Sequence, residues 1–294
     1  MFNEQFEKVK LTKGFIAALD QSGGSSANTL ALYGLNSDAW SSETEMFTLI
    51  HNMRKRIMTA KSFTEEKILG VILFENTLND TVDGVPTATY LWNQKKIVPF
   101  LKIDKGLADK VNDVQMMKDI PGLVETLQAA KAQGVFGTKM RSYILEANAQ
   151  GIEDVVAQQF EVGDTIIGQG LVPIIEPEIN IHSATRKEAE VMLRDSLLAH
   201  LNKLPKDKFV MLKLSLPLEA GFYDVLVNHP QVVRVVALSG GYPRVEACEI
   251  LSENKGIIAS YSRALLEGLK AQQTDEEFEK ALGDSIDLIY RASI

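Results

Sequence analysis

The stretch "FVMLKLSLP", residues 209 to 217, contains a lysine in a place where a charged side chain is costly. Lys213 stands within an apolar run that has the composition of a buried strand. An unpaired ammonium group is unstable away from water, so this amine must reach solvent, be paired, or give up its proton. A lysine whose pKa falls through burial or a neighbouring cation becomes a nucleophile toward carbonyl groups. Lys213 is therefore a candidate for imine formation.

Charged residues also end several other apolar runs. Glu176 and Glu178 end "LVPIIEPE", Lys139 ends "VFGTKMR", and Asp20 ends "GFIAALD". Forming an imine requires an acid or base that removes the carbinolamine oxygen as water, and we expect Glu176 to do this. We expect Glu178 to orient the lysines, Lys139 to supply a like charge that lowers the pKa of Lys213, and Asp20 to serve a second proton transfer. This set suits imine-dependent cleavage or formation of carbon-carbon bonds.

The elements that must position these residues recur along the whole chain. Eight short runs rich in Val, Ile, Leu and Phe read as strands, at 14 to 20, 67 to 74, 98 to 104, 135 to 141, 171 to 178, 209 to 215, 232 to 239 and 257 to 263. Segments with helical periodicity lie between them, which is typical of an all-parallel sheet covered on both faces. Without a linker or a shift in composition, we predict a single (β/α)8 TIM barrel over residues 1–294, with an open doubly wound sheet as the alternative.

Active sites of this fold form at the carboxyl ends of the strands, where these charged residues fall. Taken singly, each has an ordinary explanation as a turn residue, a helix cap or a lysine that reaches water. Residues two apart on a strand share a face, as do Lys102 with Asp104 and Lys139 with Arg141. The convergence of so many charges on one rim is what indicates a site.

Two segments predict binding of phosphate groups. The stretch "LSGGY" at 238 to 242 offers the backbone N–H groups of Ser239, Gly240 and Gly241 at the end of the seventh strand, and Arg263 closes the eighth. The loops after these strands are the usual phosphate site of the fold. Lys102 and "SGGSS" at 22 to 26 form a second pole across the mouth. Two anion sites around an imine lysine imply a bisphosphate.

Composition limits the other possibilities. The 294 residues carry a formal net charge of -8 with no basic run, which argues against nucleic-acid and anionic-membrane binding. Cys248 is the single cysteine, so an internal disulfide is impossible. The amino-terminal "MFNEQFEKVKL" has no apolar core segment and no later run is long enough to span a membrane, so we expect a cytoplasmic protein. The pattern does not reveal an oligomeric state.

With these residues in place, the chain resembles a class I, Schiff-base-forming fructose-1,6-bisphosphate aldolase of the shorter bacterial type. The resemblance covers nearly the whole chain and rests on eight motifs in the family's order: "AALDQSGGS", "GVILFENT", "FLKIDKG", "FGTKMR", "VPIIEPEIN", "MLKLSLP", "VVALSGGY" and "ASYSRAL". It implies a metal-independent lyase of glycolysis or gluconeogenesis that cleaves fructose 1,6-bisphosphate to dihydroxyacetone phosphate and glyceraldehyde 3-phosphate. The imine on Lys213 replaces any cofactor.

The resemblance also implies roles for individual residues. The position of Lys213 attacks the sugar ketone, that of Glu176 assists dehydration, and that of Asp20 takes the C4 hydroxyl proton. The family's substrate contacts fall on Ser22, Ser25, Lys102, Lys139, Arg141, Ser239, Gly240, Ser260 and Arg263. The sequence departs from the animal enzymes at Ser262, where they have glycine, and in "ANTLALYG", which lacks their basic phosphate contact.

Three other functions remain to be weighed. A metal-dependent aldolase needs clustered histidines, whereas His51, His182, His200 and His229 are scattered along the chain. Another Schiff-base lyase, acting on tagatose 1,6-bisphosphate or in transaldol chemistry, needs the same catalytic residues, which do not fix the stereochemistry at C4. A non-catalytic barrel that binds sugar phosphates is the third, because a fold alone does not establish activity.

Overall fold

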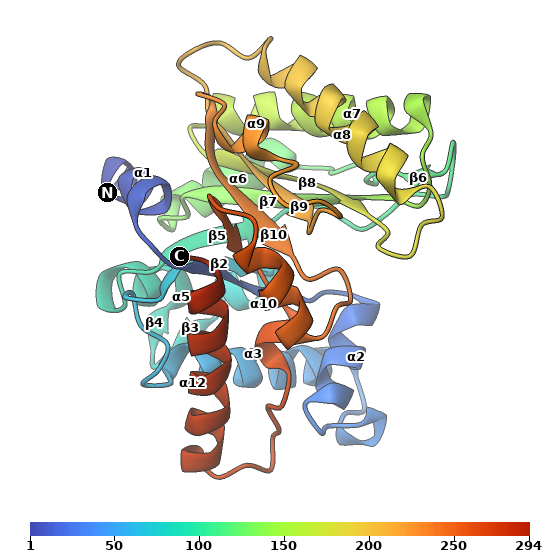
Figure 1. Ribbon diagram of the computed structural model, residues 1–294. Coiled ribbons are helices and arrows are strands. Elements are labelled where there is room, and N and C mark those ends of the chain that lie inside the picture. Colours follow the sequence, from blue (N-terminus) through green and yellow to red (C-terminus); the bar gives the residue numbers. More distant parts are fainter.

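The computed structural model describes residues 1–23 and 25–294, together with the helical backbone of Gly24. Eight parallel strands follow one another around the sheet in chain order (Figure 1). They are β1 (Phe15–Leu19), β2 (Ile68–Leu73), β5 (Val98–Lys102), β7 (Gly137–Ile144), β8 (Val172–Ile179), β9 (Val210–Ser215), β10 (Val232–Leu238) and β11 (Ile257–Ala259). The Ala18 N–H donates to the Tyr261 carbonyl at 3.1 Å and links the first strand to the segment after the last. The predicted (β/α)8 barrel is confirmed, and the open sheet is wrong.

The longer helices cover the outside of the barrel. They are α2 (Gly24–Leu32), α3 (Glu43–Thr59), α6 (Leu123–Ala132), α7 (Ala149–Gly168), α8 (Arg186–Leu201), α10 (Arg244–Ser252) and α12 (Asp275–Ala292). Helix α12 starts with a capping box between Thr274 and Glu277. None of the helices in the described ranges has both the length and the apolar character needed to cross a membrane.

The alternation of strand and helix is less regular than the sequence predicts. Only the short α9 (Asp224–Val227) follows β9, because Pro217 and Gly221 interrupt helical propagation in that connection. After β2 come α4 (Glu75–Leu78), the hairpin of β3 (Thr81–Val82) and β4 (Val85–Pro86), α5 (Thr87–Thr89) and a π-helix at Tyr90–Gln94. Strand β6 (Val114–Gln115) pairs antiparallel with β7, and α11 (Arg263–Leu266) follows β11.

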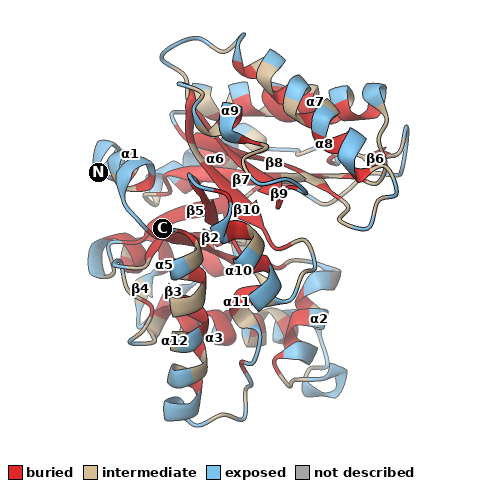
Figure 2. Ribbon diagram, in the orientation of Figure 1, coloured by how far each residue is buried: buried red, intermediate tan, exposed pale blue. Residues whose placement is uncertain are grey.

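Apolar side chains form two clusters, one inside the barrel and one between its strands and the surrounding helices. Met211 of β9 packs with Ile174 of β8 and Val236 of β10 in the cluster that fills the barrel. Its neighbours Leu212 and Leu214 belong instead to the larger cluster between strands and helices. Figure 2 shows the strands almost wholly buried and the outer faces of the helices exposed. Alternate residues of a strand thus face inward, which places Lys213 on the same side as Met211.

Helix α1 (Phe2–Leu11), dark blue in Figure 1, packs against the amino-terminal ends of the strands. The ring of Phe6 meets that of Phe209, just before β9, at 5.2 Å between centroids, and that of Phe136, just before β7, at 6.4 Å. Arg234 of β10 donates from Nε to the Val9 carbonyl at 2.9 Å. Because aromatic side chains fill this end, the space for a ligand lies at the carboxyl ends of the strands.

Candidate active site

A cavity of about 640 Å³ opens at the carboxyl ends of the strands. Five cationic side chains and four carboxylates line it, so most charges in it have a partner of opposite sign. The predicted site residues in its lining are Asp20, Ser22, Ser25, Lys102, Lys139, Arg141, Glu176, Glu178, Lys213, Ser239, Gly240, Ser260 and Arg263. Among the sequence predictions only Gly241 lies elsewhere.

Four charged groups form the buried centre of the cavity. Lys139 Nζ lies 3.0 Å from Asp20 Oδ2 and 2.6 Å from Glu176 Oε2. The other oxygen of the Glu176 carboxylate, Oε1, lies 3.3 Å from Lys213 Nζ. All four residues are at most 7% exposed, and buried charges persist at such sites because they are paired. One carboxylate therefore bridges the two lysine amines.

Burial and charge together set the protonation of this centre. Burial, together with the charge of Lys213, lowers the pKa of Lys139 to about 8, although the charge of Asp20 opposes them. Burial likewise lowers the pKa of Lys213. Burial opposes ionisation of Asp20, but the ammonium groups of Lys139, Lys213 and Lys102 outweigh it and bring its pKa down to about 2. The site thus combines an ionised carboxylate with amines that lose their protons more readily than free lysine.

Lys213 has a cationic neighbour that the sequence did not indicate. Burial and then the charge of Arg141 lower the pKa of Lys213, and the expected repulsion between Lys139 and Lys213 lowers the pKa of Lys139. Lys139 is held between the Asp20 and Glu176 carboxylates, which offset its charge. Arg141 itself pairs with Glu178, its Nε lying 2.5 Å from Oε2.

The pole formed by Lys102 contains a residue that the site prediction omitted. Lys102 Nζ donates to Asp104 Oδ1 at 2.7 Å and to the Asp104 carbonyl at 3.0 Å. Asp104 is 5% exposed, and its Oδ2 has no hydrogen-bond partner among the described residues. The two-residue spacing from Lys102 was the signal for it, since both side chains leave the strand on one face.

The hydroxyl of Ser25, in the turn after β1, is hydrogen-bonded within that turn. Ser25 Oγ donates to the Ser22 carbonyl at 2.7 Å and accepts from the Ser22 N–H at 2.9 Å. Its hydroxyl hydrogen is thus engaged within the turn. Contact of Ser25 with a ligand anion would require this bond to break.

The pole at β10 and β11 has the features of an anion site. Gly240 and Gly241 adopt φ of +62° and +115°, a region that side-chain-bearing residues rarely occupy. Among the described residues, Arg263 has no carboxylate partner, unlike the other cations of the cavity. Ser260 is 1% exposed, and its hydroxyl likewise has no partner among them. An unbalanced cation and an unpaired donor favour a bound anion here.

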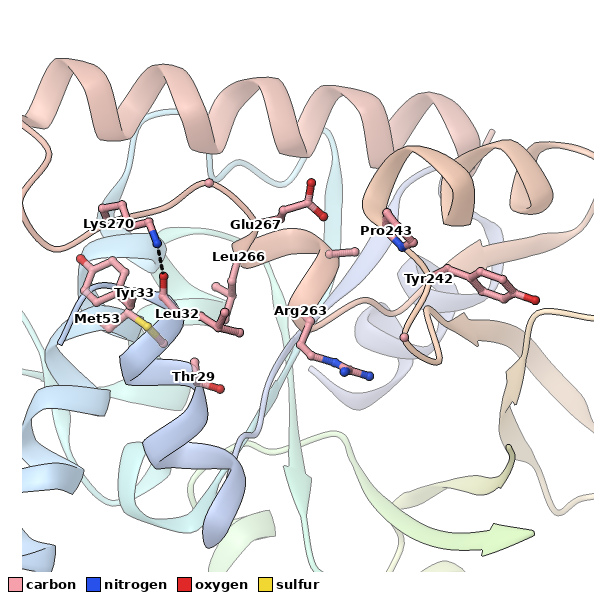
Figure 3. A pocket seen from close by; sticks show the side chains of 13 residues that line it. Thr29, Leu32, Tyr33, Met53, Tyr242, Pro243, Arg263, Leu266, Glu267 and Lys270 are labelled. Atoms are coloured by element: carbon pink, nitrogen blue, oxygen red, sulfur yellow. Dashed lines mark hydrogen bonds between the residues drawn. The ribbon is translucent and has the colours of Figure 1, made fainter. Parts of the chain in front are cut away.

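Gly241 lines a second cavity of about 460 Å³ instead. The cavities share Thr29, Leu32 and Arg263, and Figure 3 shows Arg263 between Thr29 of α2 and Tyr242. Lys270 Nζ donates to the Leu32 carbonyl at 2.6 Å across one side of it. Gly241 nevertheless lies beside the guanidinium of Arg263, which lines both cavities.

Sequence reasoning also missed a buried group behind Asp20. Arg54 of α3 is fully buried and donates to the backbone and side-chain oxygens of Gln21. Burial lowers its pKa to about 9, although the charge of Asp20 opposes this. The signal for it was present, because Arg54 follows Ile50 by four residues on the apolar face of its helix.

Comparison with known proteins agrees with this geometry. The family model "Fructose-bisphosphate aldolase class-I" matches residues 7–218. The chain is 56% identical over 291 residues to a fructose-bisphosphate aldolase class 1 from Synechocystis sp., covering 99% of this chain and 97% of that protein. It is 54% identical over 294 residues to one from Clostridium acetobutylicum, covering all of both chains.

A solved structure supports the fold independently. The fructose-bisphosphate aldolase from Plasmodium falciparum, in complex with TRAP and a small-molecule inhibitor, superposes with a TM-score of 0.82. The match covers 99% of this chain and 93% of that one at 20% identity. Together with the full-length relatives, these findings show that the chain belongs to the class I fructose-bisphosphate aldolases, the metal-independent lyases that use a Schiff-base lysine.

Proposed function

We propose that Lys213 is the residue through which this class I fructose-bisphosphate aldolase forms its imine. The main support is the position of the Glu176 carboxylate, whose oxygens lie 3.3 Å from Lys213 Nζ and 2.6 Å from Lys139 Nζ. A group in this place exchanges protons with the nitrogen that attacks and with the oxygen that leaves. Lys139 is the other lysine of the cavity that is buried, has a lowered pKa and shares the Glu176 carboxylate. It also forms an ion pair with Asp20, which leaves Lys213 as the amine for imine formation.

The first half of the reaction then follows from the geometry. Lys213 gives a proton to Glu176, and its neutral Nζ adds to the C2 carbonyl carbon of the open-chain sugar; a second Nζ proton moves to the carbonyl oxygen, which becomes the carbinolamine hydroxyl. Glu176 then passes the proton it received to that hydroxyl, which leaves as water, and the nitrogen lone pair forms the iminium double bond. Lys139 keeps the carboxylate in place through its ion pair.

Asp20 performs the bond-breaking step. Its carboxylate takes the proton of the C4 hydroxyl, and the C3–C4 bonding electrons move to the iminium. Glyceraldehyde 3-phosphate then departs, and an enamine remains on Lys213. The free carboxylate is a weak base because three ammonium groups lower its pKa. Forming the neutral enamine removes the positive charge on Lys213, so the pKa of Asp20 rises as it takes the proton. Protonation and hydrolysis of the enamine release dihydroxyacetone phosphate.

The two poles of the cavity divide the phosphates of the bisphosphate. We assign one to Ser239, Gly240, Ser260 and Arg263, and the other to Lys102 with the Ser22 to Ser25 turn. Arg141 and Glu178 stand between them as an ion pair that orients the reacting centre. Residues 1–294 would act as one catalytic domain, since the barrel draws on strands from Phe15 to Ala259, and we expect it to work in the cytoplasm.

Arg263→Ala should raise KM for fructose 1,6-bisphosphate by about tenfold to a hundredfold while kcat changes little. The reason is that an exposed guanidinium, which has no carboxylate partner among the described residues, adds binding energy equally in ground and transition states. Steady-state kinetics checks this, with exposed Arg291→Ala of α12 as the matched control. A fall in kcat at unchanged KM would contradict a phosphate-binding role.

The rate of imine formation should depend on pH. A protonated amine has no lone pair for attack, so the rate falls as the pH drops through the pKa of Lys213. Since burial lowers that pKa from 10.5, trapping with dihydroxyacetone phosphate and cyanoborohydride should level off below pH 10.5. Peptide mass spectrometry at a series of pH values gives the profile. The control is the exposed Lys280, because its hydrogen bond to Asp284 raises its pKa. A rate still rising at pH 10.5 refutes the expectation.

The same trapping reaction tests the proposed function. A reduced dihydroxyacetone phosphate adduct should appear on the peptide that contains Lys213, and a chelator should leave cleavage intact. No adduct, together with loss of cleavage on chelation, would overturn the imine assignment. Comparing kcat/KM for the fructose and tagatose bisphosphates separates the sugar specificities, and equal values would remove the preference for fructose.

A further inference from the structure

The side-chain amide of Gln21 has only one orientation that satisfies its neighbours. Its Oε1 lies 3.2 Å from Arg54 Nη2, and a guanidinium only donates hydrogen bonds. Its Nε2 lies 3.3 Å from the Ala18 carbonyl, which only accepts. The amide nitrogen is therefore the atom that faces Ser262, whose Oγ lies 2.7 Å away.

This orientation decides how Ser262 uses its hydroxyl. Because Gln21 Nε2 donates to it, Ser262 Oγ accepts that bond and its hydrogen must point elsewhere. The hydrogen bonds of the described residues include no acceptor for this hydrogen. Ser262 is partly exposed and lines the cavity, so its hydroxyl keeps a free donor at the cavity wall.

The surroundings of Ser262 indicate the ligand. The next residue is Arg263, the cation without a carboxylate partner, and two residues earlier is Ser260, whose buried hydroxyl is unpaired among the described residues. The guanidinium of Arg263 also lies beside Gly241, an exposed residue with positive φ. Donors and one unbalanced positive charge suit a phosphate monoester dianion.

We propose that Ser262 is an additional phosphate-binding residue of this aldolase, and that Arg54 and Gln21 position it by directing its hydroxyl hydrogen into the cavity. Arg54 also donates from Nη1 to Thr77 Oγ1 at 2.8 Å, which fixes the guanidinium against the segment after β2. The chain of contacts runs from Thr77 through Arg54 and Gln21 to Ser262. It links the loop of Asp20 to that of Arg263, and it rests on the proposed function for the identity of the ligand.

The direct test is Ser262→Ala. We expect KM for fructose 1,6-bisphosphate and the inhibition constant of inorganic phosphate each to rise about tenfold, with kcat within about twofold of the parent. Ser252→Ala, which removes an exposed serine hydroxyl from the end of α10, should change neither constant. Unchanged constants in Ser262→Ala, with the parent fully active, would overturn the assignment.

The positioning role needs an isosteric change at Gln21. In Gln21→Glu both oxygens accept, so Arg54 keeps its partner while the Ser262 hydroxyl turns toward the new carboxylate and away from the phosphate. KM and the phosphate inhibition constant should rise by more than in Ser262→Ala. In the Ser262→Ala background the same change should have a smaller effect, because only its added charge and the lost hydrogen bond to the Ala18 carbonyl remain. Equal effects in both backgrounds would refute the direction of the hydroxyl by Gln21.

Failure of this inference is distinguishable from failure of the proposed function. If the parent chain cleaves fructose 1,6-bisphosphate and forms the Lys213 adduct, the proposed function stands whatever Ser262 does. If the parent chain shows neither, the inhibition constants no longer report on this reaction, and the inference falls with it.

Discussion

Lys213→Met should abolish cleavage of fructose 1,6-bisphosphate, with kcat/KM falling by about 10,000-fold or more. Methionine is similar to lysine in length but has no amine, so neither the imine nor its electron sink forms. Glu176 keeps its second partner, since Lys139 Nζ lies 2.6 Å from Oε2. Coupled assays should detect no product above background, and borohydride trapping with dihydroxyacetone phosphate should give no adduct.

The fold should survive this change. Lys213 is 4% exposed on the inner face of β9 near Met211, and it shares the Glu176 carboxylate with Lys139. Removing one partner of a buried ion pair destabilises a protein, but Lys139 still pairs with Glu176, so the thermal midpoint should fall without loss of the folded state. Exposed Lys280→Met is the matched control and should keep full activity. Removal of a catalytic nucleophile lowers activity far more than tenfold. Activity of Lys213→Met within tenfold of the parent would therefore place the nucleophile at another residue.

Asp20→Asn should lower kcat for cleavage by about 100-fold to 10,000-fold while leaving the imine able to form. The amide has the shape of the carboxylate, and its oxygen still accepts from Lys139 Nζ, which lies 3.0 Å from Asp20 Oδ2. It does not take the C4 hydroxyl proton, so the C3–C4 bond persists. Single-turnover kinetics should show a trapped hexose adduct that accumulates and releases glyceraldehyde 3-phosphate slowly.

The comparison that sharpens this result is Glu176→Gln. Its carboxylate bridges the two lysines, so its loss should slow appearance of the adduct itself. Asp20→Asn should slow only the step after it. If both variants trap dihydroxyacetone phosphate at the same reduced rate, the division of roles between the two carboxylates is wrong.

Much of the architecture could be predicted from the sequence because it depends on local composition. Apolar runs bounded by charged residues marked all eight barrel strands, and the period of two placed Lys213 on the inward face with Met211. The connection after β9 was predicted less well, because propensity and apolar spacing do not fix how far a helix extends near Pro217 and Gly221.

The residues of the cavity were also largely foreseeable, since parallel strands bring their carboxyl ends to one rim. The cavity that Gly241 lines was not predictable, because a turn after a strand depends on backbone angles, here a φ of +115°, that residue spacing does not encode. Asp104 was recognised on the face of Lys102 but not as part of the site, because the ion pair between them is a matter of side-chain conformation.

The sequence by itself therefore determined the barrel, the rim and the residue types gathered there, because strand period and parallel topology are repetitive and local. Only the tertiary structure decided which charges pair. Lys139 meets Asp20 across 119 positions of the chain, and Gln21 meets Ser262 across 241. Such contacts arise when the barrel closes and each side chain selects one rotamer, and neither event leaves a pattern in the order of the residues.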